Sequence, residues 1–445
     1  MYNYHTNDSL AGAKITRDQV IAALVIILGG HISSLATSIR YGFLAISFGE
    51  RGISGRVYGL VEGSIFFGYV ASFLCRGYWD KCSERLTPKW TISIMLACQI
   101  IACTMSGLAQ YSSNNTVFVL VSILAKMLVG YTAFPQSICC LDMLKTLFPN
   151  KFDLLNGLMN MGHYSGHGVG EYIGTLLFSN YGYQVPFLFA TLYLVVAGLL
   201  SACVLPAIPS ILCTDTQSRH SQREEVHTSV TPFVMLPMCV CMLINCVYAY
   251  LQIAICPYLV DVFDIPISVG GTVLIAISAG VAIGSSLSGG LSQSRIINTY
   301  IQMAIGAGMV GLGLVLMFPT SSIPFLYNNV PYIAYPAAII SGIGDPIMTI
   351  PTLRAMTDLQ TMLKRRCTGK NSISIFGVWM MASQCSNYSG ALVGGVMMEF
   401  LTYQNGAYIL VTFCALSLVG SLFLKCAVSS YECQSTDEEK APMIT

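Results

Sequence analysis

Residues 185–207 read VPFLFATLYLVVAGLLSACVLPA, a stretch without a single charged side chain. A helix needs about twenty apolar residues to cross the hydrocarbon core of a bilayer. Inside lipid the helix is favoured because it satisfies every backbone N–H and C=O group within the segment. The stretch therefore predicts a membrane-spanning helix, and similar stretches recur almost from end to end of the chain.

The composition supports the same class for the whole chain. Hydrophobic residues make up 54% of it and charged residues only 10%, which is typical of an all-α membrane protein with many spans rather than a soluble domain. We expect twelve transmembrane helices, at residues 18–43, 56–75, 90–109, 117–138, 153–178, 185–207, 232–256, 268–290, 297–318, 331–353, 371–398 and 405–427. Pro346 and Pro351 are expected to interrupt the tenth span.

The longest polar stretch divides these spans six from six. It is rich in Ser, Thr, Gln and charged residues, as flexible linkers are. The predicted parts are an N-terminal segment (1–17), a six-helix bundle (18–207), the linker (208–231), a second six-helix bundle (232–427) and a tail (428–445). The N-terminal segment has no apolar core of the signal-peptide kind, so the first span is expected to be retained.

The Lys and Arg residues predict the orientation. With twelve spans, eighteen of the 22 basic residues fall on the side of the two termini. Only Arg51 and Arg56 fall on the other side, and Arg40 and Lys126 lie within spans. Because basic loops stay on the cytoplasmic side of a membrane, we expect both termini to be cytoplasmic.

The two halves resemble each other in their glycines. The fifth span carries GEYIGT (170–175), and its counterpart six spans later carries GALVGG (390–395). This correspondence suggests two pseudo-symmetric bundles, an organisation that secondary transporters use for alternating access. Small residues let helices approach closely, and those expected to do so are Gly162, Gly166, Gly170, Gly174, Gly390 and Gly394. Gly280 and Gly284 of the eighth span are the expected mates of the fifth span.

The fifth span also carries ionisable side chains on one face. His163, His167 and Glu171 are spaced four apart, so they line one side of a helix. A carboxylate linked to histidines can take up and release protons near physiological pH. Two other interpretations stay open. The histidines could be hydrogen-bonded packing residues, or two histidines four apart could share a zinc ion, although no third ligand is evident.

Other spans carry charges that are costly in lipid and therefore indicate function or pairing. Glu62 lies midway along the second span, and Asp345 lies in GIGDP (342–346) of the tenth, either facing a cavity or capping a broken helix. Lys126 is expected to pair with Glu62 or Glu171. The first span carries His31 and Arg40, and Arg40 is expected to extend to the outer interface.

Several classes of function are excluded or disfavoured. A net charge of +1 and the absence of a basic domain give no indication of nucleic-acid binding. The 17 cysteines show no metal-type spacing, and no nucleophile–base pair, phosphate loop or cofactor motif is evident. We therefore expect no cofactor, no metal and no enzymatic activity. Asn114, in Asn114-Asn115-Thr116, is a glycosylation acceptor on the predicted outer side.

The loop after the second span resembles a signature of the major facilitator superfamily. It reads RGYWDKCSER (76–85), and in that superfamily this segment acts as a charge latch between the halves. The resemblance makes Asp80, Lys81 and Arg85 gating candidates. Lys126 with Gly130 resembles the fourth-helix signature, in which an arginine precedes a glycine by four residues.

Within the superfamily, the first half resembles the vesicular amine and polyamine transporters. The similarity lies in NMG (160–162) and FSNYGYQVPF (178–187), with weaker support from GRVYGL (55–60). Members exchange luminal protons for cationic amines. The frame beginning at Gly170 resembles the proton-antiporter signature, with Glu171 in place of a proline. The first span lacks the aspartate of the monoamine members, which favours a polyamine or another organic cation.

The resemblance and the buried charges together predict a transporter. We expect proton-coupled alternating-access transport of a small organic solute, an amine or polyamine cation, by a monomer in a vesicle or plasma membrane. Glu171 and Asp345 are the expected cation or proton sites, and His163 and His167 the relay. Two alternatives stay open: a facilitator of anions or neutral solutes with Arg40 and Lys126 as ligands, and a transporter-like receptor or scaffold.

Overall fold

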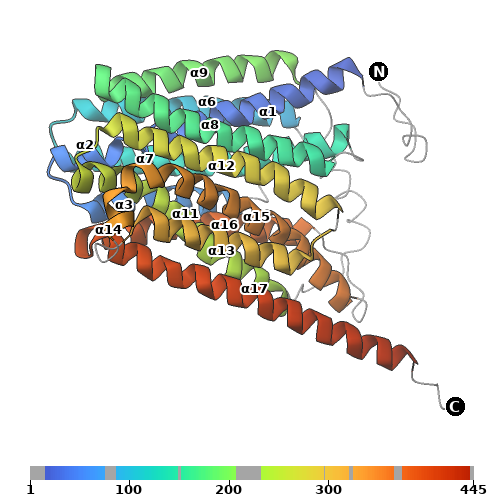
Figure 1. Cartoon of the computed structure of the whole chain (residues 1–445). Helices are drawn as coiled ribbons and strands as arrows, with labels where there is room; N and C mark the ends of the chain where they lie inside the picture. The colour runs from blue at the N-terminus through green and yellow to red at the C-terminus, as the bar shows by residue number, and fades with distance from the viewer. Residues whose placement is uncertain are drawn as a thin grey trace.

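The computed structural model describes residues 16–75, 87–148, 152–206, 232–294, 296–319, 324–364 and 373–440. The predicted gating residues Asp80, Lys81 and Arg85 and the predicted linker 208–231 lie outside the described residues. Long helices run side by side through the molecule (Figure 1). Helix α1 begins and helix α17 ends on the same side of this bundle, which we call the terminal side.

The first half of the chain forms one group of helices. These are α1 (Arg17–Ser38), α2 (Leu44–Glu50), α3 (Gly55–Gly63), α4 (Ile65–Leu74), α6 (Pro88–Leu108), the short 3-10 helix η2 (Ala109–Tyr111), α7 (Asn115–Leu147), α8 (Phe152–Tyr181) and α9 (Gln184–Val204). The second half contributes α11 (Pro232–Phe263), α12 (Ile267–Ser294), α13 (Thr299–Met317), α14 (Pro324–Asn328), α15 (Val330–Lys364), α16 (Ile373–Phe400) and α17 (Tyr403–Lys440).

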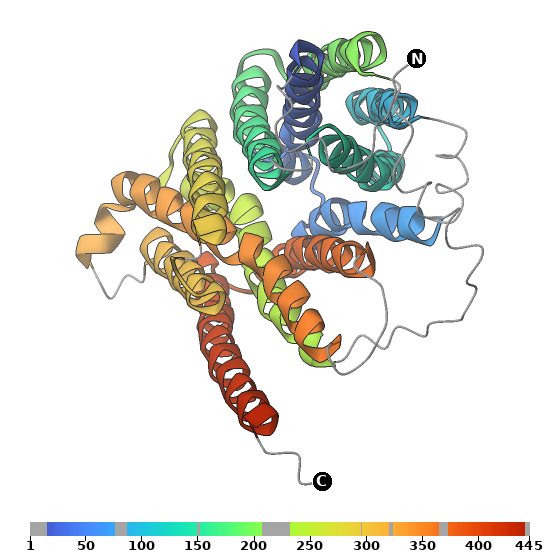
Figure 2. The same cartoon turned by 90° about the vertical axis from the view of Figure 1, so that its right-hand side faces the viewer.

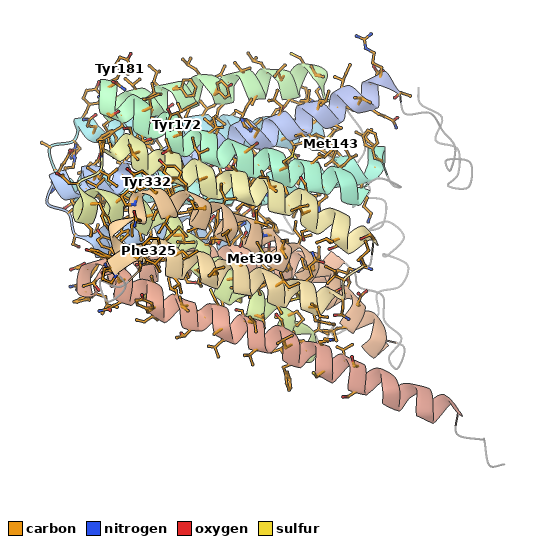
Figure 3. The ribbon with its side chains drawn as sticks, viewed as in Figure 1. Met143, Tyr172, Tyr181, Met309, Phe325 and Tyr332 are labelled. Carbon is orange, nitrogen blue, oxygen red and sulfur yellow. The ribbon has the colours of Figure 1, made fainter. Side chains whose placement is uncertain are left out.

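Ten segments of the described chain are long and apolar enough to cross a membrane. Helices α3 and α4 count together as one of them, Gly55–Leu74. Helices α8 and α16 run through the same bundle, and with these two the number of crossings is twelve, as the sequence predicts. Exposed aromatic side chains, Tyr181, Phe325 and Tyr332, lie toward the end opposite the terminal side (Figure 3), where an aromatic belt would meet the lipid headgroups.

Each half has its own hydrophobic core. One core consists of buried residues of α1 to α9 and their connections, with Ile253 of α11 added. The other consists of residues of α11 to α17 and their connections. Viewed along the helices, the two groups lie on either side of the molecular centre (Figure 2). Most of the buried hydrophobic residues of each group thus pack within that group.

Glycines set the same helix pairing in both halves. A Cβ atom at Gly166 or Gly170 would collide with the carbonyls of His31 and Leu35 of α1, and one at Gly174 with the carbonyl of Ile39, the residue that follows α1. In the second half, Gly390 and Gly394 lie against Cys246 and Ile253 of α11. The fifth crossing of each half thus packs on the first crossing of that half, because only glycine allows so close an approach.

One predicted glycine contact is wrong. Gly280 and Gly284 pack against Ile339, Gly342 and Ile343 of α15, not against the glycine stripe of α8. Helices α8 and α12 do meet, with Gly168 against Ser278. The prediction was wrong because the spacing of glycines indicates a close helix contact but does not identify the neighbouring helix.

We expect Gly174→Ala to lower the stability of the protein. The added methyl group would enter the space of the Ile39 carbonyl, and overpacking of this kind costs about 1–3 kcal/mol. The thermal unfolding midpoint in detergent should therefore fall. Gly198→Ala on α9 is the matched control, because no atom lies within 4 Å of a Cβ built there. Equal midpoints for the two variants would contradict the packing role.

Two helix boundaries differ from the prediction. Helix α15 continues through Pro346 and Pro351 without interruption, because α12 and α13 pack against it through Gly342 and Gly344 and hold the backbone in place. Asp345 therefore does not cap a broken helix. The second span is instead divided at Ser64, whose Oγ donates to the carbonyl of Val61 at 2.7 Å, a common cause of bends.

Candidate functional site

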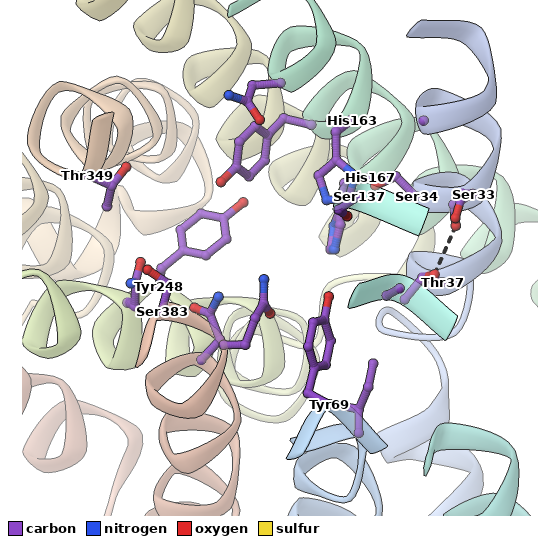
Figure 4. A pocket seen from close by; sticks show the side chains of 18 of the residues that line it. Ser33, Ser34, Thr37, Tyr69, Ser137, His163, His167, Tyr248, Thr349 and Ser383 are labelled. Carbon is purple, nitrogen blue, oxygen red and sulfur yellow. Dashed lines mark hydrogen bonds between the residues drawn. The ribbon is translucent and has the colours of Figure 1, made fainter. Parts of the chain in front are cut away.

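A cavity of about 320 Å³ lies between the two halves. The first half lines it with residues of α1, α3, α4, α6, α7 and α8, and the second half with residues of α11, α15 and α16. Figure 4 shows the side chains of His163, His167 and Ser33 facing those of Tyr248 and Thr349 across it. The cavity therefore has the position in which repeat-built transporters bind their solutes.

On the side of the molecule opposite the terminal side, contacts between α3 and α16 join the two halves. Arg56 Nη2 lies 2.8 Å from Glu399 Oε1, and the Arg56 guanidinium lies 4.2 Å from the centre of the Phe400 ring. Next to this pair, Gly59 and Gly395 are close enough that a Cβ atom on Gly59 would lie 3.1 Å from the Cα of Gly395. On the terminal side the cavity includes Asn156, in the first turns of α8.

Glu62 and Lys126 form a buried ion pair. Their side chains are each 1% exposed, and the Lys126 ammonium bonds Glu62 Oε2. The same ammonium lies 4.7 Å from the centre of the Tyr41 ring, an additional cation–π contact. Glu62 and Glu171 were the two predicted partners of Lys126, and in the structure Lys126 pairs with Glu62. The pair is electrically neutral as a unit, although Glu62 lines the cavity.

Arg40 does not extend to the outer interface as predicted. It is buried, with 5% of its surface exposed, and its Nε has no hydrogen-bond partner among the described residues. The chain turns after α1 at Ile39 and enters the short helix α2 at Leu44. The prediction was wrong because it assumed that the span ends at the membrane surface near Phe43.

His167 and Glu171 form a second buried pair. His167 Nδ1 lies 3.1 Å from Glu171 Oε1 and 3.4 Å from Nε2 of Gln252, a residue of α11 in the other half. The His167 ring stacks on Tyr41 with centroids 5.4 Å apart. His167 lines the cavity, whereas Glu171 does not and is 1% exposed. The histidine thus separates the acid from the cavity.

The other two predicted histidines lie apart from this pair. The His163 ring lines the cavity, and its centroid is 6.3 Å from that of His167. His31 does not line the cavity. Its Nδ1 lies 3.0 Å from Ser165 Oγ and 3.2 Å from the Gly162 carbonyl, so it joins α1 to α8 in the packed interface of the first half.

Asp345 is the acid of the second half that faces the cavity. It is 3% exposed, it lines the cavity, and its Oδ1 has no hydrogen-bond partner in the described structure. Within the described part of the chain, no Lys, Arg or His forms an ion pair with it. An isolated buried carboxylate is costly unless it is protonated or paired with a cation.

The family model for the Major Facilitator Superfamily matches residues 26–363. The chain belongs to the major facilitator superfamily. Among curated proteins no sequence matches significantly. Two solved structures are similar to this one, the nucleoside transporter NupG and a point mutant of NupG. Both are 13% identical to this chain and cover 92% of it, with TM-scores of 0.64 and 0.66 over 99% and 100% of their own lengths.

These comparisons confirm the predicted fold class and exclude an enzyme. A major facilitator protein is a multi-pass membrane protein that moves small solutes. The identity to NupG is low, so the likeness concerns the fold alone. The amine branch that the sequence resembles is not among these findings.

Asn and Gln side chains that line the cavity were not identified from the sequence. Eight of them line the cavity from both halves: Gln99, Gln136, Asn156, Asn160, Asn245, Gln252, Gln384 and Asn387. The site candidates chosen from the sequence were ionisable side chains, yet an uncharged amide in an apolar span also carries a desolvation cost and marks a polar interior. Their presence within otherwise apolar spans was the signal that could have identified them.

Two remaining predictions concern positions outside the cavity. Asn114 lies in the exposed turn before α7, and its side chain accepts a hydrogen bond from the Thr116 N–H at 2.8 Å, so glycosylation there stays a prediction. No group of three His, Cys, Asp or Glu side chains that could hold a metal occurs among the described residues. The histidines of α8 therefore have no third ligand near them in that part of the chain.

Proposed function

We propose that this major facilitator protein exchanges protons for a small organic cation that carries a single positive charge. The observation that supports this most is Asp345, a cavity-lining carboxylate without a partner among the described residues. A carboxylate can hold either a proton or a cationic substrate, and the two compete for it. Competition at one site between the two halves produces exchange when the site alternates between the two sides.

The charge balance of the cavity favours one positive charge over several. Glu62 is already neutralised by Lys126, and Glu171 is screened from the cavity by His167. Asp345 is left as the acid that can hold a substrate. A polyamine with several ammonium groups would find a counter-ion for only one of them, and burying the others unpaired is costly.

Aromatic side chains complete the cation site. Tyr164, Tyr248 and Trp379 line the same cavity as Asp345. Faces of aromatic rings attract cations, most strongly in tryptophan. Tyr41 already has this contact with Lys126. The walls near Asp345 can therefore stabilise an ammonium group without adding a second fixed charge.

The His167–Glu171 pair supplies a second place for a proton. His167 is in contact with the cavity, with Glu171 behind it and with Gln252 of the opposite half. Movement of α11 relative to α8 would change the Gln252 contact, and with it the proton affinity of the pair. We infer that this pair exchanges protons with the cavity while Asp345 holds the substrate.

A neutral solute of the nucleoside class is the second candidate. The eight cavity amides can form hydrogen bonds in both directions, which suits a solute with several polar groups and a planar ring. The structurally similar NupG is a nucleoside transporter. In this case Asp345 would bind protons only, and the solute would move without charge.

Orientation and assembly follow from the same reasoning. We propose that the terminal side is cytoplasmic because eighteen of 22 basic residues are predicted there. The cavity is formed within one chain, so a monomer is sufficient for transport. A vesicle or plasma membrane suits an exchanger that uses a proton gradient.

Uptake into proteoliposomes with an acidic interior tests the function. The purified chain is given radiolabelled phenethylamine, spermidine or uridine, with and without the gradient, and uptake by protein-free liposomes is subtracted. We expect phenethylamine to accumulate only when the gradient is present, and spermidine and uridine to accumulate far less. Uridine uptake that exceeds phenethylamine uptake would support the second candidate. No gradient-dependent uptake of any of the three would contradict the proposal.

Glu171→Gln tests the proton relay in the same assay. The change keeps the shape of the side chain but removes its proton exchange. We expect gradient-driven phenethylamine uptake to fall about tenfold, with the protein still monodisperse. Glu50→Gln is the matched control, because Glu50 lies exposed at the end of α2. Wild-type uptake by the Glu171 variant would rule out its role.

A further inference from the structure

One amide of the cavity is held in a fixed orientation. Ser33 Oγ donates to Gln99 Oε1 at 2.8 Å, and Gln99 Nε2 donates to Gln136 Oε1 at 2.8 Å. These three residues come from α1, α6 and α7, and all of them line the cavity. Because the Gln99 carbonyl accepts from the Ser33 hydroxyl, the Gln99 amide group is directed at Gln136. Gln136 Oε1 accepts this bond, so the Gln136 carbonyl faces Gln99.

The amide nitrogen of Gln136 is left for another partner. Within the described part of the chain, its N–H groups make no hydrogen bond. Gln136 is 6% exposed, and its amide nitrogen is in contact with open space. It therefore faces the cavity as a donor, and leaving such a donor unsatisfied when solute fills the cavity would weaken binding.

The opposite wall presents the complementary group. Asp345 of α15 and Gln136 of α7 both line the cavity, Asp345 as an acceptor and Gln136 as a donor. The two belong to different halves of the molecule. A solute bound between the halves would meet an acceptor from one half and a donor from the other.

We propose that Gln136 is a specificity-determining residue, which recognises a hydrogen-bond acceptor on the transported cation, and that Gln99 and Ser33 are its positioning residues. The substrate is then an amine whose ammonium group binds Asp345 and whose remote oxygen accepts from Gln136. The inference rests on the proposed function, because it concerns the same cavity. A site built to hydrogen-bond a substrate group rejects analogues that lack the group.

Matched pairs of amines test this recognition. The probes are tyramine against phenethylamine, and 5-aminopentanol against pentylamine, so that each pair differs by one hydroxyl group. Binding to purified full-length protein and proteoliposome uptake are both measured. We expect the wild type to prefer the hydroxylated amine about tenfold in at least one pair, and the ratio of the two affinities to fall to about one in Gln136→Met.

Two further variants separate recognition from folding. Gln136→Asn keeps the amide and should retain part of the preference. Gln99→Met frees the Gln136 side chain and should lower the ratio of affinities within each pair of amines, whereas a purely structural role of Gln99 would lower both affinities together and leave the ratio unchanged. If the preference is absent in both wild-type pairs, or persists in Gln136→Met, the inference is overturned. A wild type that neither binds nor moves any of the four amines refutes the proposed function itself, and the inference with it.

Discussion

Asp345→Asn should abolish gradient-driven accumulation of phenethylamine while leaving the fold intact. Asparagine has nearly the shape of aspartate, but it can neither carry a negative charge nor release a proton in the working pH range. A hydrogen bond to a charged partner contributes about 1.5–3 kcal/mol, so loss of the contact corresponds to a fall of at least about tenfold in affinity. Loss of proton exchange at the same site should reduce accumulation further.

Asp261→Asn is the matched control for this variant. Asp261 lies near the end of α11, where it accepts a hydrogen bond from the Tyr403 hydroxyl at 2.6 Å, and it does not line the cavity. It should keep most of the uptake. The Asp345 variant should also be at least as heat-stable as the wild type, because it removes an unpartnered buried charge. Normal accumulation by Asp345→Asn would show that the substrate and the proton bind elsewhere.

Lys126→Met should strongly destabilise the protein. It would leave the Glu62 carboxylate buried without its counter-ion. Breaking a buried ion pair by removing one partner costs about 3–5 kcal/mol, a large part of the stability of a protein. We expect a lower thermal midpoint and much less monodisperse protein in detergent.

The double variant Glu62→Gln with Lys126→Met tests the reason for that loss. It removes both charges, so most of the lost stability should return. If the single variant is as stable as the wild type, the pair is not a structural unit. If the double variant is no better than the single one, the loss comes from packing around Lys126 rather than from the unpaired acid.

The sequence predicted the architecture because each membrane crossing requires an apolar stretch of sufficient length, which can be read along the sequence alone. A stretch such as residues 185–207 must be a helix in lipid, whatever its neighbours are. The helix α9 (Gln184–Val204) follows that prediction closely. The pairing of Lys126 with Glu62 was also among the predicted alternatives, because two opposite charges in a low-dielectric interior have few other solutions.

The errors arose where three-dimensional neighbours decide the outcome. The sequence does not say which helix lies against Gly280, and the structure places α15 there. Pro346 is a helix breaker in isolation, but the helices packed around α15 hold it continuous. Arg40 is long enough to reach an interface, yet the turn after Ile39 buries it. The first two errors concern contacts between segments that are far apart in the chain, and the third concerns a local turn.

The cavity was predicted only through its charged residues. Asp345, Glu62, His163 and His167 do line it, but Glu171 lies behind His167 and His31 lies in the packed interface between α1 and α8. The spacing of residues along a helix shows which of them share a face. It does not show how deeply each side chain is buried. The eight amides come from helices of both halves, so a structure is required to recognise them as one surface.

The contacts on the closed side indicate where the molecule must open. The Arg56–Glu399 pair and the neighbouring glycines join the two halves away from the terminal side. Access from that side requires α3 and α16 to separate. The ion pair is partly exposed, with side-chain exposures of 53% and 27%, and such pairs are weak, so they can break during a transport cycle.

The central claim is that a proton and an organic cation compete for Asp345. The most direct measurement is the pH inside proteoliposomes, followed with a trapped dye while phenethylamine is added outside in the absence of any imposed gradient, with the change in protein-free liposomes subtracted. The account predicts that amine entry drives protons out and raises the internal pH in the wild type, and that Asp345→Asn shows no such change. An unchanged internal pH despite measured amine entry, or an equal pH change in the variant, would contradict it.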